Sequence, residues 1–118
     1  MILGIGTDLV NNKKIKKIYQ KYGDRFLNKI LSANEKIDFF NLKSSQKLKF
    51  LCSSFAAKEA LVKALGSGFR GIYPPDISMK KNELGKPKLI NHKLENITHH
   101  LSITNTDSYT LSFIVLEK

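Results

Sequence analysis

The sequence of 118 residues contains a single cysteine, Cys52, and no apolar run that approaches the length of a membrane span. One cysteine cannot form a disulfide within the chain, and it excludes a metal site built from several cysteines. The N-terminus lacks the basic and apolar regions of a signal peptide, since Asp8 interrupts its only short apolar stretch. We therefore expect a cytoplasmic, soluble protein with no membrane segment.

Acidic residues and arginine are also scarce, whereas lysine is abundant. The chain has 10 Asp and Glu against 20 Lys and Arg, and only Arg25 and Arg70 are arginines. The resulting net charge of +10 attracts anions such as nucleic acid, phosphorylated ligands or an acidic protein. The hydrophobic fraction of 42% is ordinary for a globular protein, and the length fits a single domain over residues 1–118.

The order of predicted elements favours an α+β fold, because helices and strands do not alternate regularly. The last third predicts two hairpins, one with the loop NELGKP and one that turns at residues 105–108. We expect a small antiparallel sheet packed with helices. The other predicted elements are a strand at 2–10, a helix at 13–22, a short helix from near Ala33, and a long helix from Ser44 or Ser45 to Leu65, ended by Gly66. The core stripe of the helix at 13–22 is expected at Ile15, Ile18, Tyr19 and Tyr22. Ser32 and Glu35 fit a capping box at the start of the short helix.

The first predicted strand, ILGIGTDLV, has two different faces. Alternation places Gly4, Gly6 and Asp8 on one side. The apolar residues of the other side are Leu3, Ile5 and Leu9. We expect the apolar side to pack and the glycine side to be an open backbone surface that ends in a carboxylate; a bulge or an edge strand is the alternative.

The stretch FAAKEALVKALGSGF, residues 55–69, is apolar around most of a helix yet carries Lys58, Glu59 and Lys63. Charges on a buried helix need partners. One interpretation is an internal pair of Glu59 with Lys63, with Lys58 extending to water. The other brings Glu59 to Asp8, where the two carboxylates hold Mg²⁺ and Lys63 faces the phosphates of a substrate.

Five motifs in this order resemble the holo-[acyl-carrier-protein] synthases, the short bacterial branch of the 4′-phosphopantetheinyl transferases. They are GIGTDLV, RFLNKILSANE, FAAKEALVKALGSGF, GKP and LSIT. The resemblance implies Mg²⁺-dependent transfer of 4′-phosphopantetheine from coenzyme A to a serine of apo acyl carrier protein. Adenosine 3′,5′-bisphosphate is released, and the product supports fatty acid biosynthesis. It also implies the family fold, and homotrimers that bind coenzyme A between subunits.

The resemblance also implies site residues. Asp8 and Glu59 would bind Mg²⁺ and, with Lys63, form the catalytic set; the general base stays open between Glu59 acting through a metal-bound water and that water as hydroxide. The residues expected to bind coenzyme A are Asp8, Glu59, Lys63, Ser67, Gly68, Pro87, Asn105 and Thr106. The residues expected to dock the acidic carrier protein are Lys13, Lys14, Lys17, Lys21 and Arg25.

Four positions depart from the family pattern. Asn11 replaces a usual Glu, Lys14 a common Arg, Ser54 a usual Arg and Asn105 a usual His. The last two positions belong to the region that receives the nucleotide end of coenzyme A, where Lys47 or Lys49 could replace lost 3′-phosphate contacts. No catalytic role is expected for Asn105.

Two other functions explain less of the sequence. A small nucleic-acid-binding module would explain the net positive charge, but gives no reason for Asp8 and Glu59. A non-catalytic subunit of a carrier-protein complex would not need Glu59 and Lys63. We therefore expect an enzyme that binds no nucleic acid.

Overall fold

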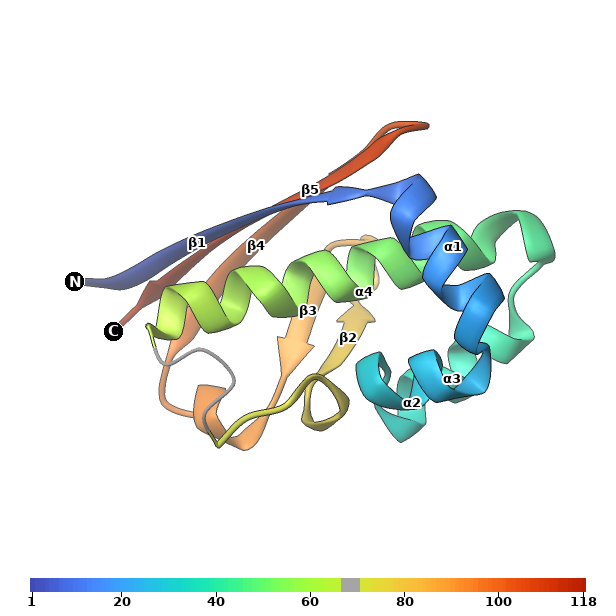
Figure 1. The fold of residues 1–118 in the computed structure, drawn as a ribbon. Coiled ribbons are helices and arrows are strands. Elements are labelled where there is room, and N and C mark those ends of the chain that lie inside the picture. The colour runs from blue at the N-terminus through green and yellow to red at the C-terminus, as the bar shows by residue number, and fades with distance from the viewer. Residues whose placement is uncertain (67–70) are drawn as a thin grey trace.

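The computed structural model describes residues 1–66 and 71–118 and has the predicted α+β architecture (Figure 1). Ser67 and Gly68, predicted to contact phosphate, lie outside the described residues. The elements are β1 (Ile2–Asn11), α1 (Asn12–Tyr22), α2 (Asp24–Ile30), α3 (Ala33–Asn41), α4 (Ser44–Leu65), β2 (Ser78–Lys81), β3 (Pro87–Ile90), β4 (Thr98–Asn105) and β5 (Tyr109–Glu117), with short 3-10 helices at Pro74–Asp76 and His92–Leu94.

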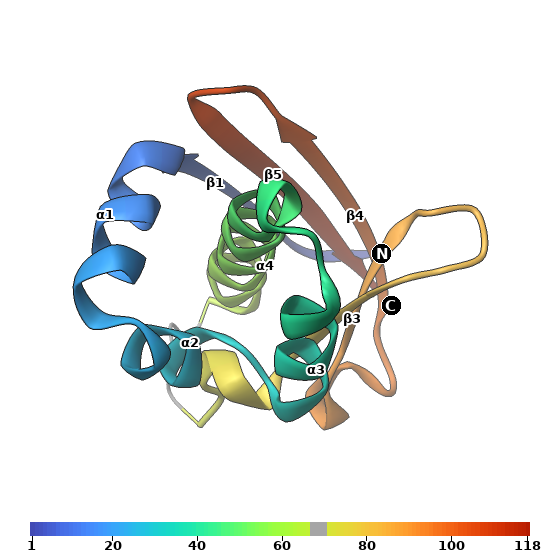
Figure 2. The ribbon, with the colours of Figure 1, turned by 90° about the vertical axis from the view of Figure 1, so that its right-hand side faces the viewer.

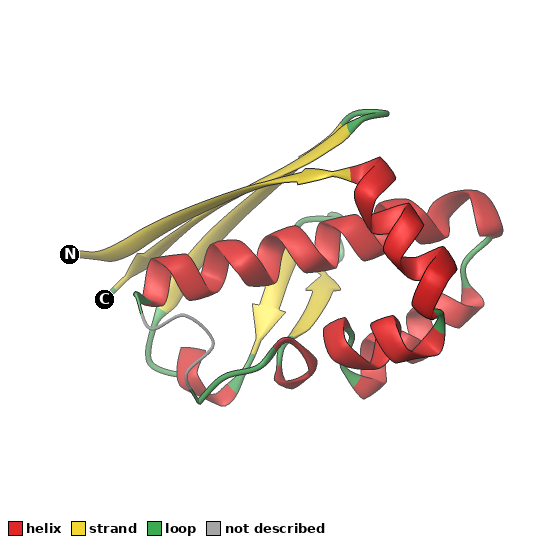
Figure 3. Cartoon of the chain, in the orientation of Figure 1, coloured by secondary structure: helices red, strands yellow, loops and turns green. Residues whose placement is uncertain are grey.

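Helix α4 runs through the centre of the molecule. An antiparallel sheet in the order β1-β5-β4 covers one side of it, and the two-stranded β2–β3 sheet lies on another side. Seen along α4, helix α1 lies on the opposite side from β3 and β4 (Figure 2). Helices α1, α2 and α3 gather at the end where α4 begins (Figure 3). The predicted arrangement of a small antiparallel sheet packed with helices is confirmed.

The length of α4 divides the core into two parts. Its second half, which includes Ala57, Ala60 and Leu61, packs against the sheet and the β2–β3 hairpin. Its first half, with Leu51 and Ala56, packs against α1, α2 and α3. The helix ends as predicted at Gly66, whose φ of 75° lies in the left-handed region that glycine adopts readily.

Strand β1 packs on the core with its glycine face, whereas its apolar face was expected to do so. A Cβ built on Gly6 would lie 1.9 Å from the carbonyl oxygen of Ala60, and one on Gly4 would lie 2.0 Å from that of Ala64. The glycines are therefore the surface on which the strand touches the backbone of α4. Ile5 and Leu9 point outward and are 62% and 63% exposed. The prediction of an open glycine surface was wrong, because absent side chains permit close packing as well as open backbone. The alternative is confirmed: β1 is an edge strand of its sheet, and its pairing with β5 is irregular between Ile2 and Gly4.

Both predicted hairpins are present. In the first, the side chain of Asn82 accepts hydrogen bonds from the backbone N–H groups of Leu84 and Lys86, which closes the loop between β2 and β3. In the second, the hydroxyl of Thr106 accepts from the N–H of Tyr109 at 2.9 Å. In the part of the chain that the structure describes, no helix has both the length and the apolar character needed to cross a bilayer.

Candidate active site

The inner face of β1 and the second half of α4 bring Asp8, Glu59 and Lys63 together. The ammonium nitrogen of Lys63 lies 3.2 Å from Oδ1 of Asp8 and 3.0 Å from the carbonyl oxygen of Thr7. The Asp8 side chain is only 15% exposed, whereas that of Lys63 is 55% exposed. Lys63 therefore reaches from solvent to a nearly buried carboxylate, and the glycines of β1 set how closely that carboxylate approaches α4.

Glu59 is half-buried beside this pair. Burial raises the pKa of its carboxyl above the ordinary value, the negative charge of Asp8 raises it further, and Lys63 partly opposes both. The two carboxylates are therefore close enough to repel each other, which a cation placed between them would relieve.

Oxygen ligands of this kind suit Mg²⁺, which is commonly bound by one or two carboxylates together with water and substrate phosphates. No group of three or more acidic, histidine or cysteine side chains capable of holding a metal occurs among residues 1–66 and 71–118. Asp8 and Glu59 are two carboxylates of the type that binds Mg²⁺, and further ligands of such an ion would have to be water, a substrate phosphate or residues outside the described ranges.

The third charge on α4, Lys58, is not at this site. Its side chain is 1% exposed, forms an ion pair with Glu35, and donates to the carbonyl oxygen of Ile30 at 2.6 Å. Burial lowers the pKa of Lys58, and the charge of Glu35 opposes that shift. The interpretation in which Lys58 extends to water was therefore wrong. The same interpretation paired Lys63 with Glu59. Lys63 instead pairs with Asp8, because β1 packs against α4 and places that carboxylate beside the lysine.

A second group of predicted residues lines a hollow of about 390 Å³ at the start of α4. Pro87 and Asn105 lie in its wall with Lys49, Ser53 and Lys81. The amide nitrogen of Asn105 donates to the hydroxyl of Ser53 at 3.1 Å and to that of Thr110 at 2.9 Å. The hollow therefore offers two ammonium groups beside polar side chains, a combination suited to a phosphorylated ligand.

The carboxylate site and the hollow lie at opposite edges of the main sheet. Asp8 is on β1, Asn105 is on β4, and β5 separates the two strands. The structure thus brings Asp8, Glu59 and Lys63 into one group and Pro87 and Asn105 into another. Thr106 uses its hydroxyl to close the β4–β5 turn.

Comparison with known proteins agrees with this geometry over the length of the chain. The sequence model of the 4′-phosphopantetheinyl transferase superfamily matches residues 4–114. The chain belongs to the 4′-phosphopantetheinyl transferase superfamily. The holo-[acyl-carrier-protein] synthase of Wolbachia pipientis subsp. Culex pipiens is 43% identical, over 98% of both chains. That of Staphylococcus aureus strain JH9 is 42% identical, over 100% of this chain and 98% of the relative.

Solved structures of the superfamily have the same fold. The crystal structure of the Neisseria meningitidis holo-[acyl-carrier-protein] synthase aligns with a TM-score of 0.91 and 35% identity over the whole of both chains. The Bacillus anthracis synthase, in complex with coenzyme A (3′,5′-ADP), aligns with a TM-score of 0.88 and 35% identity, over 98% of this chain and 96% of that one. The predicted fold and the predicted family of enzymes are confirmed.

Two departures from the superfamily pattern have local structural explanations. The side chain of Asn11 caps α1 by accepting from the backbone N–H groups of Lys13 and Lys14 at 3.0 and 3.3 Å. Ser54 is fully buried, and its hydroxyl donates to Glu35 at 2.6 Å. In this chain the Ser54 side chain is therefore used in the packing of α4 on α3, and the placement of position 54 in the region that receives the nucleotide end of coenzyme A stays a prediction.

The lysines expected to contact phosphate or the carrier protein have different surroundings. Lys49 lines the hollow, whereas the ammonium of Lys47 lies over the ring of Phe39, 5.3 Å from its centroid. On α1, Ile15 faces the core and the basic residues face solvent. The residues predicted to dock the carrier protein are all exposed, and Lys16 of α1 is exposed beside them; the predicted set is Lys13, Lys14, Lys17, Lys21 and Arg25.

Sequence reasoning missed the partner of Lys58. Ser32 and Glu35 form the predicted capping box at the start of α3, in which Glu35 accepts from the N–H of Ser32 at 2.9 Å. The same carboxylate also accepts from Ser54 and from the N–H of Met79 at 3.2 Å. The capping motif was the available signal, but nothing in its spacing indicates contacts with α4 and β2.

Proposed function

We propose that this chain transfers the 4′-phosphopantetheine group of coenzyme A to a serine hydroxyl of apo acyl carrier protein, in support of fatty acid biosynthesis. The observation that carries the proposal is the meeting of Asp8, Glu59 and Lys63 from segments about fifty residues apart. Membership of the superfamily over residues 4–114 supports the reaction class. A cytoplasmic location and the absence of a nucleic-acid partner stay predictions.

In the proposed reaction, the serine oxygen bonds to the phosphorus that carries pantetheine, and the bond from that phosphorus to the bridging oxygen breaks. Adenosine 3′,5′-bisphosphate leaves with the electron pair of that bond, and the serine loses its proton. Such transfers depend on in-line positioning and on neutralisation of phosphate charge. Lys63 is exposed enough to turn its ammonium group toward a bound diphosphate.

Asp8 and Glu59 are the residues that would hold Mg²⁺, which when bound supplies Lewis-acid stabilisation and orients the diphosphate. Burial is the main cause of the raised pKa of Glu59, and the negative charge of Asp8 raises it further, so a cation bound between the two carboxylates would be favourable. The same shift makes Glu59 suited to accept the serine proton.

We propose that the active enzyme is a homotrimer in which coenzyme A lies between subunits. The outer face of the main sheet is apolar: Leu9 pairs with Leu111, and Phe113 lies beside them on β5. These side chains are 63%, 44% and 42% exposed, and monomers rarely expose a contiguous apolar patch of this kind. A neighbouring copy would cover the patch. Within one chain, the carboxylate site and the hollow with Lys49 and Asn105 lie at opposite edges of the main sheet. In a trimer, the hollow of a neighbouring copy would lie next to the carboxylate site.

The proposed carrier-protein surface is the exposed basic side of α1. Lysines occupy it without an acidic residue, so its field favours an acidic partner. Arg25 extends the surface at the start of α2. We expect these residues to affect affinity for the carrier protein more than affinity for coenzyme A.

The proposal is tested by incubating the protein with coenzyme A, Mg²⁺ and apo acyl carrier protein and weighing the carrier by mass spectrometry. We expect the carrier to gain one phosphopantetheine group. Asp8→Asn and Glu59→Gln should abolish the gain, while Asp38→Asn, an exposed carboxylate on α3, should retain it. A carrier of unchanged mass with the wild-type protein would refute the function. Full transfer by either site variant at saturating Mg²⁺ would refute the metal assignment.

A further inference from the structure

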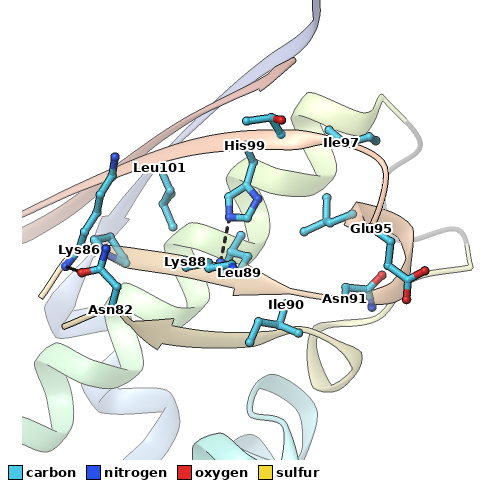
Figure 4. Close-up of a pocket in the computed structure, with 13 residues that line it drawn as sticks. Asn82, Lys86, Lys88, Leu89, Ile90, Asn91, Glu95, Ile97, His99 and Leu101 are labelled. Carbon is cyan, nitrogen blue, oxygen red and sulfur yellow. Dashed lines mark hydrogen bonds between the residues drawn. The ribbon is translucent and has the colours of Figure 1, made fainter. Parts of the chain in front are cut away.

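The two sheets of the molecule meet edge to edge at β3 and β4. Strand β3 is paired with β2, and β4 is paired with β5. Within residues 1–66 and 71–118 no backbone ladder joins β3 to β4. A hollow of about 570 Å³ lies along this junction (Figure 4). The position of the β2–β3 hairpin relative to the main sheet therefore depends on side chains.

One of these side chains is the imidazole of His99. It extends from β4 toward β3, and its Nε2 atom accepts a hydrogen bond from the backbone N–H of Leu89 at 3.1 Å (Figure 4). Leu89 is 1% exposed, so its N–H has little access to water if this bond is lost. His99 thus supplies the acceptor that a neighbouring strand would otherwise provide.

The bond requires a neutral ring. A backbone N–H can only donate, so Nε2 must carry a lone pair and the ring proton must be on Nδ1. Burial is the main cause that lowers the pKa of His99, with further contributions from the charges of Lys88 on β3 and His100 on β4. Lys86 and Glu95 also line the hollow. The ring therefore stays neutral at physiological pH, and protonation would convert the acceptor to a donor and break the bond.

Strand β3, which carries Leu89, also lines the hollow of about 390 Å³ described with the candidate active site. Pro87 lies two residues before Leu89 on β3, and the hairpin also supplies Lys81 and Gly85 to that hollow. Asn105, at the far end of β4, forms the opposite wall. The bond between His99 and Leu89 thus links the two strands whose spacing sets the width of the hollow.

We propose that His99 is a positioning residue for coenzyme A, which holds the β2–β3 hairpin at the distance from β4 that the ligand requires. This inference rests on the proposed function, in which that hollow takes part of coenzyme A. His99 itself touches neither the reacting atoms nor the carboxylate site. It acts through Leu89 and the hairpin.

The test compares His99→Leu, which removes the acceptor, with His99→Gln, whose amide oxygen can accept from Leu89. His100→Gln is the matched control, since His100 is exposed on the same strand and contacts Glu117. At neutral pH we expect His99→Leu to raise the KM for coenzyme A about 3- to 10-fold with kcat within about twofold, as for the loss of one hydrogen bond. His99→Gln and His100→Gln should keep the wild-type KM.

The pH profile gives a readout that a purely structural role would not change. In the wild type, the KM for coenzyme A should rise as the pH falls below the usual titration range of histidine. In His99→Gln this rise should be lost, because the amide does not titrate. A wild-type KM in His99→Leu, or an unchanged acid limb in His99→Gln, would overturn the inference.

The exchange rate of the Leu89 amide hydrogen separates this inference from the proposed function. We expect faster exchange in His99→Leu and wild-type protection in His99→Gln, whether or not the protein transfers phosphopantetheine. If the wild type transfers nothing, the proposed function fails, and amide exchange still tests the hydrogen bond between Leu89 and His99. If the Leu89 amide is equally protected in all variants, the inference that His99 holds β3 in place is refuted even in a fully active enzyme.

Discussion

The substitution Gly6→Ala tests whether the bare face of β1 determines the geometry of the candidate active site. The added Cβ would lie 1.9 Å from the carbonyl oxygen of Ala60 and 2.9 Å from the nitrogen of Ala64. Ordinary contact begins at 3.4 Å, and both neighbours are backbone atoms of a buried helix. The strand must therefore move away from α4 by about 1.5 Å, since the helix cannot yield as a flexible side chain would.

This displacement has two consequences of different size. Overpacking of a core typically destabilises a protein by about 1–3 kcal/mol, which for a domain of this length lowers the Tm by roughly 4–12 °C. Asp8 lies two residues further along the same face, so it moves away from Glu59 and Lys63. A misplacement of about 1 Å in a catalytic group can reduce the rate about 100-fold. We expect kcat/KM for transfer to fall by about that factor.

Gly4→Ala is the matched comparison, because its Cβ would lie 2.0 Å from the carbonyl oxygen of Ala64 but further from Asp8. It should lower the Tm to a similar extent and reduce transfer less. Asp38→Asn, at an exposed position of α3 away from β1, should change neither quantity. The measurements are thermal unfolding by circular dichroism and transfer followed by mass spectrometry. A Gly6→Ala protein with wild-type Tm and wild-type activity would refute the reasoning.

Four further predictions concern the core, the thiol and the proposed surfaces. Lys58→Met leaves the buried carboxylate of Glu35 uncompensated and should lower the free energy of unfolding by about 3–5 kcal/mol in urea titrations; a loss below about 1 kcal/mol would contradict the role of the pair. Burial raises the pKa of Cys52 to about 11, so at pH 8 the thiol should react with a disulfide reagent only when the protein unfolds, and rapid reaction of the folded protein would disprove its burial. Leu9→Asp should dissociate the proposed trimer in light scattering, whereas an unchanged mass would count against this face as the interface. Lys17→Glu should raise the KM for carrier protein and leave that for coenzyme A unchanged; equal effects on both would argue against α1 as the docking surface.

Local signals in the sequence were sufficient for most of the fold. The first helix, the capping box at Ser32, and the stop at Gly66 each depend on neighbouring residues, and the structure confirms all three. The expected core stripe of the first helix is only partly confirmed, because Ile15 is buried whereas Ile18 and Tyr22 are 38% and 45% exposed. The two hairpins follow in the same way from alternation and turn residues. Helix α2 was not predicted, since its seven residues are too few to establish a helical period.

Long-range relations were harder to predict. Alternation shows that β1 has two faces, but not which one meets α4; that depends on the backbone of Ala60 lying close enough to exclude any side chain. Helical position places Lys58 on a buried surface, but its partner Glu35 comes from another helix. Ser54 donates to the same carboxylate of Glu35, and this contact between α4 and α3 likewise cannot be read from neighbouring residues. The grouping of Asp8 with Glu59 and Lys63 was one of two interpretations that the charges on an apolar helix left open, and the family resemblance favoured it.

The packing of β1 links the candidate active site to the proposed assembly. Because the glycine face lies against α4, the larger side chains of the strand must point outward, and Ile5 and Leu9 are exposed for that reason. The same alternation directs Asp8 inward to Lys63. A single strand thus presents a carboxylate to one side and an apolar surface to the other. In the proposed trimer, a neighbour pressing on the outer face would hold β1 against α4, so loss of assembly should loosen the carboxylate site as well as remove the neighbour's hollow.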